Sequence, residues 1–171
     1  LEERPIDLLF IGSMNPRRQA FIQRVEACGF SVASFDHPLY GAERDHFVRQ
    51  SKAVLNAHFY ESSRFEQARA FHCLSLGTPV ISERTARTQA PAAFEDAVFW
   101  LDEEGVEPFF RGVFNQPAYF VAARSRLQGF RPPDPTQASA DLLAFAAVED
   151  IPALGPTDRR RRGDLRMRAR V

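Results

Sequence analysis

The sequence lacks the features that mark several common classes of protein. It has only two cysteines, Cys28 and Cys73, without C-x-x-C spacing, which is typical of buried thiols in a reducing compartment. No apolar stretch approaches the ~20 residues that span a bilayer, and the charged residues 1–5 contain no signal-peptide core. We therefore expect a soluble, cytoplasmic protein without a transmembrane segment.

Motifs that hold phosphates or metals at fixed spacing are also missing. Neither G-x-G-x-x-G nor G-x-x-x-x-G-K-[ST] occurs, which disfavours a dinucleotide cofactor and excludes a P-loop nucleotide hydrolase. There is no D-x-D motif, and the four histidines are scattered along the chain. No Ser-His-Asp or Cys-His set follows from the spacing either. We predict no bound metal and no resident cofactor.

Net charge is absent as well, since 22 basic residues balance 22 acidic ones. Residues 158–171 contain seven arginines and two aspartates, a local balance of +5, so the rest of the chain sums to −5. This distribution does not describe a globally basic nucleic-acid binder, and we predict no nucleic-acid partner. A contact of the 159–162 arginine run with nucleic acid or anionic lipid is a weaker alternative.

What the sequence does contain is an alternation of short apolar runs with amphipathic segments, which indicates β-α-β units and a parallel sheet. Apolar runs predict strands at residues 6–11, 30–35, 53–59, 78–82 and 97–101. Helical spacing predicts helices at residues 16–28, 42–50, 65–76 and 106–128, with a new start or a kink at Pro117. We expect an α/β fold over residues 1–130, a Rossmann-like three-layer α/β/α domain whose mostly parallel sheet has about five strands.

The composition changes after Phe130. Pro132, Pro133 and Pro135 break the pattern, residues 138–148 predict one short helix, and the Arg-rich end is typical of a solvated, disordered tail. Residues 131–171 are therefore expected to be an extension rather than a second domain. The chain begins at Leu1 without Met, which is compatible with an excised piece of a longer protein.

In an open parallel sheet, ligands bind beyond the carboxyl ends of the strands, near helix N-termini. The first such loop contains Gly12, Ser13, Asn15, Arg17 and Arg18. Glycine permits close approach of the backbone, the polar side chains can hydrogen-bond, and each arginine can bind phosphate. An alternative is a plain turn in which Asn15 caps the helix and both arginines are solvated.

The densest polar cluster follows the third predicted strand. It comprises Asn56, His58, Tyr60, Glu61, Ser62, Ser63, Arg64, Glu66 and Arg69. Alternation within the strand puts Asn56 and His58 on the same side. Structural alternatives exist, because Ser63 and Glu66 have capping-box spacing, Glu66 and Arg69 can form a surface ion pair, and a histidine in an apolar strand is commonly a core residue.

Three short segments of the sequence resemble those of a known family. They are LNAHFYE at residues 55–61, FEQAR at 65–69 and LGTPVISE at 76–83, preceded by FIGS at 10–13 with Asn15, Arg17 and Arg18. Together they resemble the C-terminal nucleotide-sugar-binding domain of GT-B-fold glycosyltransferases, in particular bacterial glycosyltransferase-like proteins. The resemblance covers about residues 5–128 and follows the family's order of elements.

The resemblance implies a metal-independent transfer of a hexosyl group from a nucleotide-diphosphate sugar. It implies catalytic roles for His58 and Glu61, with Glu61 near the sugar, and Glu66 as the acid that binds the ribose. The remaining donor-binding candidates are Gly12, Ser13, Asn15, Arg17, Arg18, Tyr60, Ser62 and Arg69. The more familiar family pattern has an acid five residues before the glycine that ends the helix, and here His72 stands at that position.

In such enzymes the acceptor base normally comes from a separate N-terminal domain, which this chain lacks. The isolated domain is therefore expected to bind donor weakly and to turn over little. The alternative is a non-catalytic Rossmann-like module that binds nucleotide or another protein. His72 in place of the acid favours this alternative, as does the lack of a partner domain.

Overall fold

The computed structural model describes residues 1–60 and 65–132, together with Thr136, Ala140 and Ala144. The chain divides into two compact units, Leu1–Pro132 and Pro133–Val171. The first unit contains the sheet and its helices. Of the predicted helix at residues 138–148, only Ala140 and Ala144 are described, and both are helical. The rest of that helix and the Arg-rich tail lie outside the described residues.

The first unit is built on one parallel sheet with the strand order β2-β1-β3-β4-β5. Its strands are β1 (Ile6–Phe10), β2 (Val32–Ala33), β3 (Ser51–Asn56), β4 (Val80–Glu83) and β5 (Phe99–Leu101). Every pair is parallel, and in the central pair Leu8 lies opposite Ala53 and Phe10 opposite Leu55. The predicted α/β class with a five-stranded parallel sheet is confirmed.

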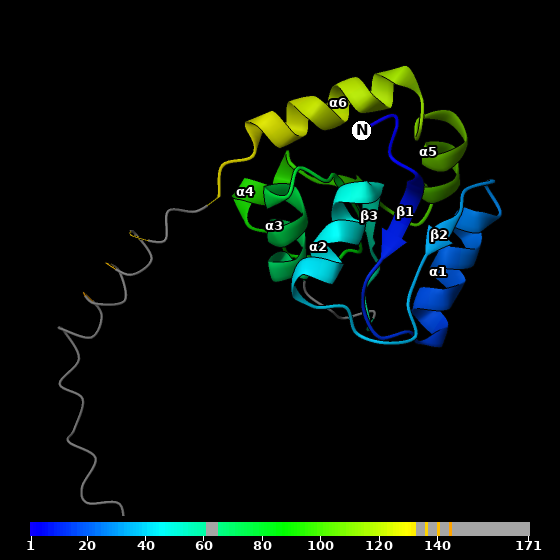
Figure 1. Cartoon of the computed structure of the whole chain (residues 1–171), viewed down its shortest axis with the longest axis horizontal. Helices are drawn as coiled ribbons and strands as arrows, with labels where there is room; N and C mark the ends of the chain where they lie inside the picture. The colour runs from blue at the N-terminus through cyan, green and yellow to red at the C-terminus, as the bar shows by residue number, and fades with distance from the viewer. Residues whose placement is uncertain (61–64, 133–135, 137–139, 141–143, 145–171) are drawn as a thin grey trace, which may run out of the picture. The chain divides into compact units, whose positions relative to one another are not determined.

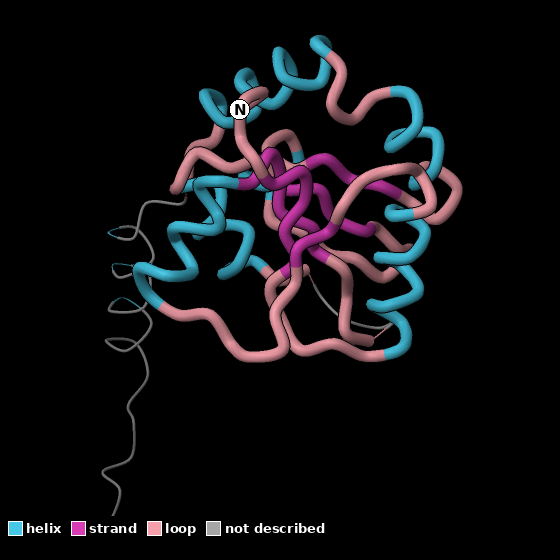
Figure 2. Tube along the Cα trace, turned by 45° about the vertical axis from the view of Figure 1, so that its right-hand side comes forward, coloured by secondary structure: helices cyan, strands magenta, loops and turns pink. Residues whose placement is uncertain are grey.

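Helices follow the strands and cover both faces of the sheet (Figure 1). They are α1 (Pro16–Glu26), α2 (Gly41–Gln50), α3 (Gln67–Ser75), α4 (Ala92–Glu95), α5 (Val106–Gly112) and α6 (Pro117–Gly129). Buried side chains of α1, α5 and α6 pack on one face, and those of α2, α3 and α4 pack on the other. The tube in Figure 2 shows the strands enclosed between these two sets.

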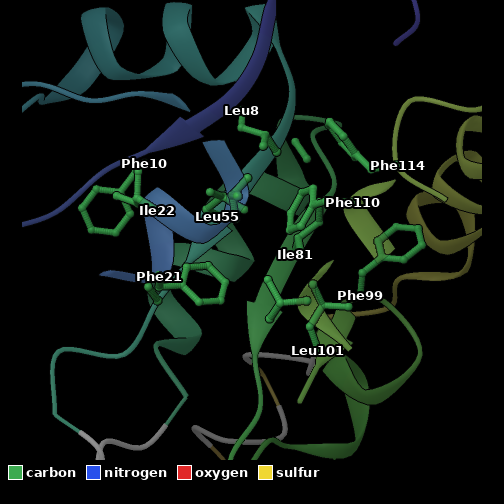
Figure 3. Close-up of a cluster of buried hydrophobic side chains, with 14 of the residues drawn as sticks. Leu8, Phe10, Phe21, Ile22, Leu55, Ile81, Phe99, Leu101, Phe110 and Phe114 are labelled. Atoms are coloured by element: carbon green, nitrogen blue, oxygen red, sulfur yellow. The ribbon is translucent and has the colours of Figure 1, made fainter. Parts of the chain in front are cut away.

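The first face holds the larger hydrophobic cluster (Figure 3). It joins Leu55 and Ile81 of the sheet to a group of aromatic rings contributed largely by α5, α6 and the turn between them. The ring centroids of Phe110 and Phe114 lie 5.4 Å apart and those of Phe114 and Tyr119 lie 4.9 Å apart, with edge-to-face geometry in both pairs. The unusual number of phenylalanines thus supplies apolar area to the core.

Several predicted boundaries differ from the structure. The predicted strand at 30–35 is reduced to the two residues of β2, because this edge strand pairs only with β1 while the rings of Phe30 and Phe35 turn into the two opposite clusters. The predicted strand at 53–59 ends at Asn56, so His58 belongs to the following loop. As expected, Pro117 starts a new helix. The short helix α4 has no counterpart in the prediction.

The described helices include none that is long and apolar enough to cross a membrane. Both cysteines are free thiols. Cys73 is buried within α3, and burial raises the pKa of its thiol to about 12. Cys28 lies just beyond the end of α1 and is only partly buried, so the expectation of two buried helical thiols holds for Cys73 alone.

The packing predicts a large difference between core and surface truncations. Phe110→Ala removes a ring that is 1% exposed and should lower the free energy of unfolding by about 3–5 kcal/mol. Val121→Ala, at a position 62% exposed, should change it by less than about 0.5 kcal/mol. Urea denaturation followed by circular dichroism measures both, and equal losses for the two variants would contradict the assigned core.

Candidate functional site at the switch point of the sheet

The strand order places a topological switch point between β1 and β3. The chain leaves β1 through α1 to form β2 on one side, and returns through α2 to form β3 on the other. In sheets of this kind the loops separate at such a point and leave a crevice where ligands bind. Figures 1 and 2 both show the β1–α1 and β2–α2 connections running side by side beyond the tip of β1.

Two stretches singled out in the sequence come together here, residues 12–18 and the described parts of residues 56–69, which are 56–60 and 65–69. Asn15 caps α1 by accepting a hydrogen bond from the Arg18 amide at 2.8 Å, as the structural alternative predicted. Its Nδ2 also donates to the carbonyl of Phe59 at 2.7 Å. Arg17 donates to the carbonyl of His58 at 3.0 Å. The first and third loops are therefore in contact, but of the described residues 56–60 and 65–69 only Arg69 lines the cavity described below.

Arg18 is the most buried charged residue of the site, with 3% of its surface exposed. Its three nitrogens donate to Ala57 O at 2.9 Å, to Ser13 O at 2.8 Å and to Glu66 Oε1 at 2.6 Å. The guanidinium also lies 5.1 Å from the centroid of the Phe59 ring. Burial lowers the pKa of Arg18, and the neighbouring Glu66 partly opposes that shift. The side chain is thus directed into the protein rather than toward a ligand.

Arg17 forms a two-pronged ion pair with Glu83, the last residue of β4. One prong, Nη1 to Oε2, measures 2.7 Å, and the same carboxylate oxygen accepts the backbone N–H of His58 at 3.1 Å. Burial alone would raise the pKa of Glu83, but the hydrogen bonds from Arg17 and His58 outweigh it and lower the pKa. The ends of β3 and β4 are therefore tied to the start of α1.

Glu66 bridges two arginines, because its second oxygen pairs with Arg69. Arg69 also donates to Asn56 Oδ1 at 2.9 Å, and Asn56 Nδ2 donates to Ser82 Oγ at 3.0 Å. We call Arg17, Arg18, Arg69, Glu66 and Glu83 the arginine–glutamate network. Three arginines against two glutamates leave it with one excess positive charge.

The predicted capping box at Ser63 and Glu66 is not formed. Helix α3 begins at Gln67, so Glu66 occupies the N-cap position instead of the third helical position, and its side chain makes no capping hydrogen bond. The carboxylate is drawn toward Arg18 and Arg69, whose charge-assisted bonds outcompete a bond to a backbone amide. The alternative prediction was a surface ion pair between Glu66 and Arg69. The pair is present, but both side chains are half-buried.

His58 is completely buried, and both ring nitrogens lack a hydrogen-bond partner among the described residues. Burial lowers the pKa of its imidazole, opposed by the charge of Glu83 and reinforced by that of Arg17. In this conformation the ring does not reach solvent. The suggestion of a core histidine agrees with its burial, while its catalytic role stays a prediction.

A cavity of about 550 Å³ opens at the switch point. Its described lining residues are Phe10, Ile11, Gly12, Ser13, Met14, Phe35, Asp36, His37, Pro38, Leu39, Tyr40 and Arg69. The volume lies in the range of small-molecule sites. One wall is thus the loop after β1 with Arg69, and the other is the loop after β2.

Gly12 brings the first wall close to Arg69. Its φ of +146° lies in a region that favours glycine, and an added Cβ would stand 3.0 Å from Arg69 Nη2 and 3.3 Å from Arg18 Nη1. Both Gly12 and Ser13 are exposed on the cavity wall. The backbone here approaches two guanidinium groups without a side chain between them.

The second wall, residues 35–40, was missed by the sequence reasoning. The signal was present, because this segment follows a predicted strand and therefore lies at the same edge of the sheet as the other two loops. It carries a hydrogen bond between the side chains of Asp36 and His37, and an exposed ring, Tyr40. This segment has fewer polar residues than the loop after β3. The density of polar residues therefore pointed to the loop after β3 as the second wall of the cavity, whereas the structure places residues 35–40 there.

The remaining candidates lie elsewhere or outside the described residues. Tyr60 is 66% exposed and packs edge-to-face on Phe59. Glu61 and Ser62 lie outside the described residues. His72, which stands where the family pattern has an acid, pairs with Asp45 of α2 at 2.7 Å. Within residues 1–60 and 65–132 no group of three or more His, Cys, Asp or Glu side chains is placed to hold a metal ion.

No family model matches the chain. The sequence is similar to uncharacterized protein L140 of Acanthamoeba polyphaga mimivirus, with 27% identity over 92 residues. The match covers 54% of this chain and 27% of the viral protein, so the chain spans about a quarter of the length of that relative.

Removing the buried guanidinium should be costly. Arg18→Met leaves the carbonyls of Ala57 and Ser13 without a donor and breaks the pair with Glu66, so we expect a loss of about 3–5 kcal/mol in the free energy of unfolding. Arg124→Met breaks the exposed pair with Glu2 and should cost less than about 1 kcal/mol. Urea titrations compare the two, and a loss for Arg18→Met as small as that for Arg124→Met would contradict the network's structural role.

The burial of His58 predicts a dependence of stability on pH. Because its folded pKa is lowered from 6.5, the unfolded chain binds more protons, and stability must fall as the pH drops below about 6.5 toward the folded pKa. His58→Phe should flatten the decline in melting temperature between pH 7 and 5.5, whereas His46→Gln, at an exposed position, should leave it unchanged. An unaltered slope in His58→Phe would show that this ring does not titrate in that range.

Proposed function

We propose that the chain is the donor-binding half of a glycosyltransferase and holds a nucleotide-diphosphate sugar in the switch-point cavity. The observation that carries the proposal is the cavity itself, about 550 Å³ beside Gly12 and Arg69. Its first wall belongs to the sequence run that resembles the GT-B donor domain. The resemblance and the place of the cavity in the sheet support the same class of ligand.

In this proposal Arg69, rather than Arg17 or Arg18, contacts the phosphates. Arg18 is buried and Arg17 is paired with Glu83, so both act as positioning residues that fix the loop. Arg69 lines the cavity and belongs to a network with one excess positive charge. A guanidinium beside exposed backbone at Gly12 and Ser13 suits a diphosphate.

The proposed chemistry needs stabilisation of the charge that develops on the diphosphate when the glycosidic bond breaks. Fixed donors at Arg69 and the loop amides supply this without a metal ion. The base that deprotonates the acceptor comes from a separate N-terminal domain in this scheme. The viral relative, most of which lies outside the matched segment, is compatible with such a larger arrangement. In this proposal Glu61 keeps its place near the sugar, Tyr60 and Ser62 stay donor-binding candidates, and the enzyme is cytoplasmic.

A second candidate is a non-catalytic nucleotide-binding module. Two observations favour it: His58 has no access to solvent, and Glu66 is held between Arg18 and Arg69. Such a module would bind a nucleoside diphosphate and its sugar derivative equally well. A donor domain should bind the sugar nucleotide differently from the free nucleotide and hydrolyse it slowly.

Calorimetric titration tests the proposal directly. We expect UDP or GDP, with the corresponding nucleotide sugars, to bind with dissociation constants between about 10 μM and 1 mM, the range of weak ligands. Arg69→Gln should weaken binding at least tenfold, because it removes the cation that lines the cavity. Arg111→Gln, an exposed arginine of α5, serves as the matched control and should bind like wild type.

Melting curves of both variants establish that the fold is retained. The absence of heat for every nucleotide and nucleotide sugar at millimolar concentration would remove the proposed function. Binding without any hydrolysis, and with equal affinity for UDP and UDP-sugar, would favour the non-catalytic module instead.

A further inference from the structure

The switch-point cavity has two chemically different walls. The wall formed by Gly12, Ser13 and Arg69 offers backbone and a cation. The wall formed by residues 35–40 offers one carboxylate, an imidazole and aromatic rings, with Tyr40 73% exposed. The parts of a nucleotide differ in the same way. Its phosphates need cationic or amide donors, its ribose offers hydroxyl donors to a carboxylate, and its base offers a flat face to an aromatic ring.

The family resemblance suggests Glu66 as the acid that binds the ribose, but its carboxylate is already bonded to two arginines. Its Oε1 accepts from Arg18 at 2.6 Å and its Oε2 pairs with Arg69. To bind a ribose hydroxyl it would have to give up one of two charge-assisted bonds, one of them to a buried guanidinium. Glu66 is also not among the described residues that line the cavity.

Asp36 meets the requirements that Glu66 does not. It lies three residues beyond β2, its side chain is 97% exposed, and it lines the cavity opposite the first wall. Its Oδ1 is held by His37 Nδ1 at 2.9 Å, and this hydrogen bond lowers the pKa of Asp36, so the group is an ionised acceptor at neutral pH. In Rossmann-like sheets an acid beyond the second strand is well placed to accept the hydroxyls of a ribose.

We infer that Asp36 is the residue that accepts the ribose hydroxyls of the nucleotide, with the base directed toward Tyr40 and the phosphates toward Arg69. This inference rests on the proposed function, since it assigns an orientation to the ligand in the same cavity. It makes residues 35–40 the specificity wall and leaves Glu66 as a positioning residue for the two arginines.

The test compares ribose with deoxyribose. UDP and 2′-deoxy-UDP, or the guanine pair if GDP binds better, are titrated into wild type, Asp36→Asn, Glu66→Gln and Glu43→Gln. The last variant removes an exposed acid of α2 outside the cavity lining and controls for lost negative charge. Wild type should prefer the ribonucleotide about tenfold, as expected for one hydrogen bond to a charged acceptor.

Asp36→Asn should abolish that preference by weakening only the ribonucleotide, while Glu66→Gln and Glu43→Gln retain it. A retained preference in Asp36→Asn, or its loss in Glu66→Gln with the fold intact by circular dichroism, overturns the inference and leaves the proposed function standing. No binding of either nucleotide to wild type overturns both, so the two failures are distinguishable.

Discussion

The architecture of the candidate site depends on one buried cation, Arg18. A guanidinium removed from water is unfavourable unless each of its donors finds an acceptor. Here the acceptors come from two connections: Ser13 lies in the loop after β1, whereas Ala57 and Glu66 lie between β3 and α3, with Glu66 at the N-cap position of α3. Their convergence on one side chain holds the β1 and β3 loops at a fixed distance.

This arrangement divides the charged residues into two groups with different tasks. The first group holds the ends of the strands and the start of α1 together, and it comprises Arg17, Arg18 and Glu83. Arg69 belongs to the same network through Glu66, yet it also lines the cavity. A cation fixed by a partner carboxylate and by Asn56 loses little conformational entropy when it meets an anion, which favours recognition of phosphate.

The sequence was informative where a local rule decides the structure. The α/β class followed from the spacing of apolar runs, and the starts of α1 and α6 followed from Pro16 and Pro117. The convergence of the first and third loops followed from the rule for parallel sheets. These features need no knowledge of which side chains meet.

The ion pairs and the composition of the cavity could not be derived in this way. Nothing local distinguishes Arg17, which pairs with Glu83, from an arginine that binds a ligand, because that pairing joins residues 66 positions apart. The loop at 35–40 was passed over because its two polar residues are fewer than those after β3. The walls of a cavity depend on which loops are neighbours, and the neighbours follow from the order of the strands in the sheet. Strand order is a tertiary property, so it does not follow from identifying each strand in the sequence.

The most direct test of the account is a crystal structure of the chain with a bound nucleoside diphosphate. The account predicts density in the switch-point cavity, with diphosphate oxygens within hydrogen-bonding distance of Arg69 and of the backbone at Gly12 and Ser13. A nucleotide bound elsewhere, with that cavity unchanged and Arg69 directed away from the phosphates, would contradict it.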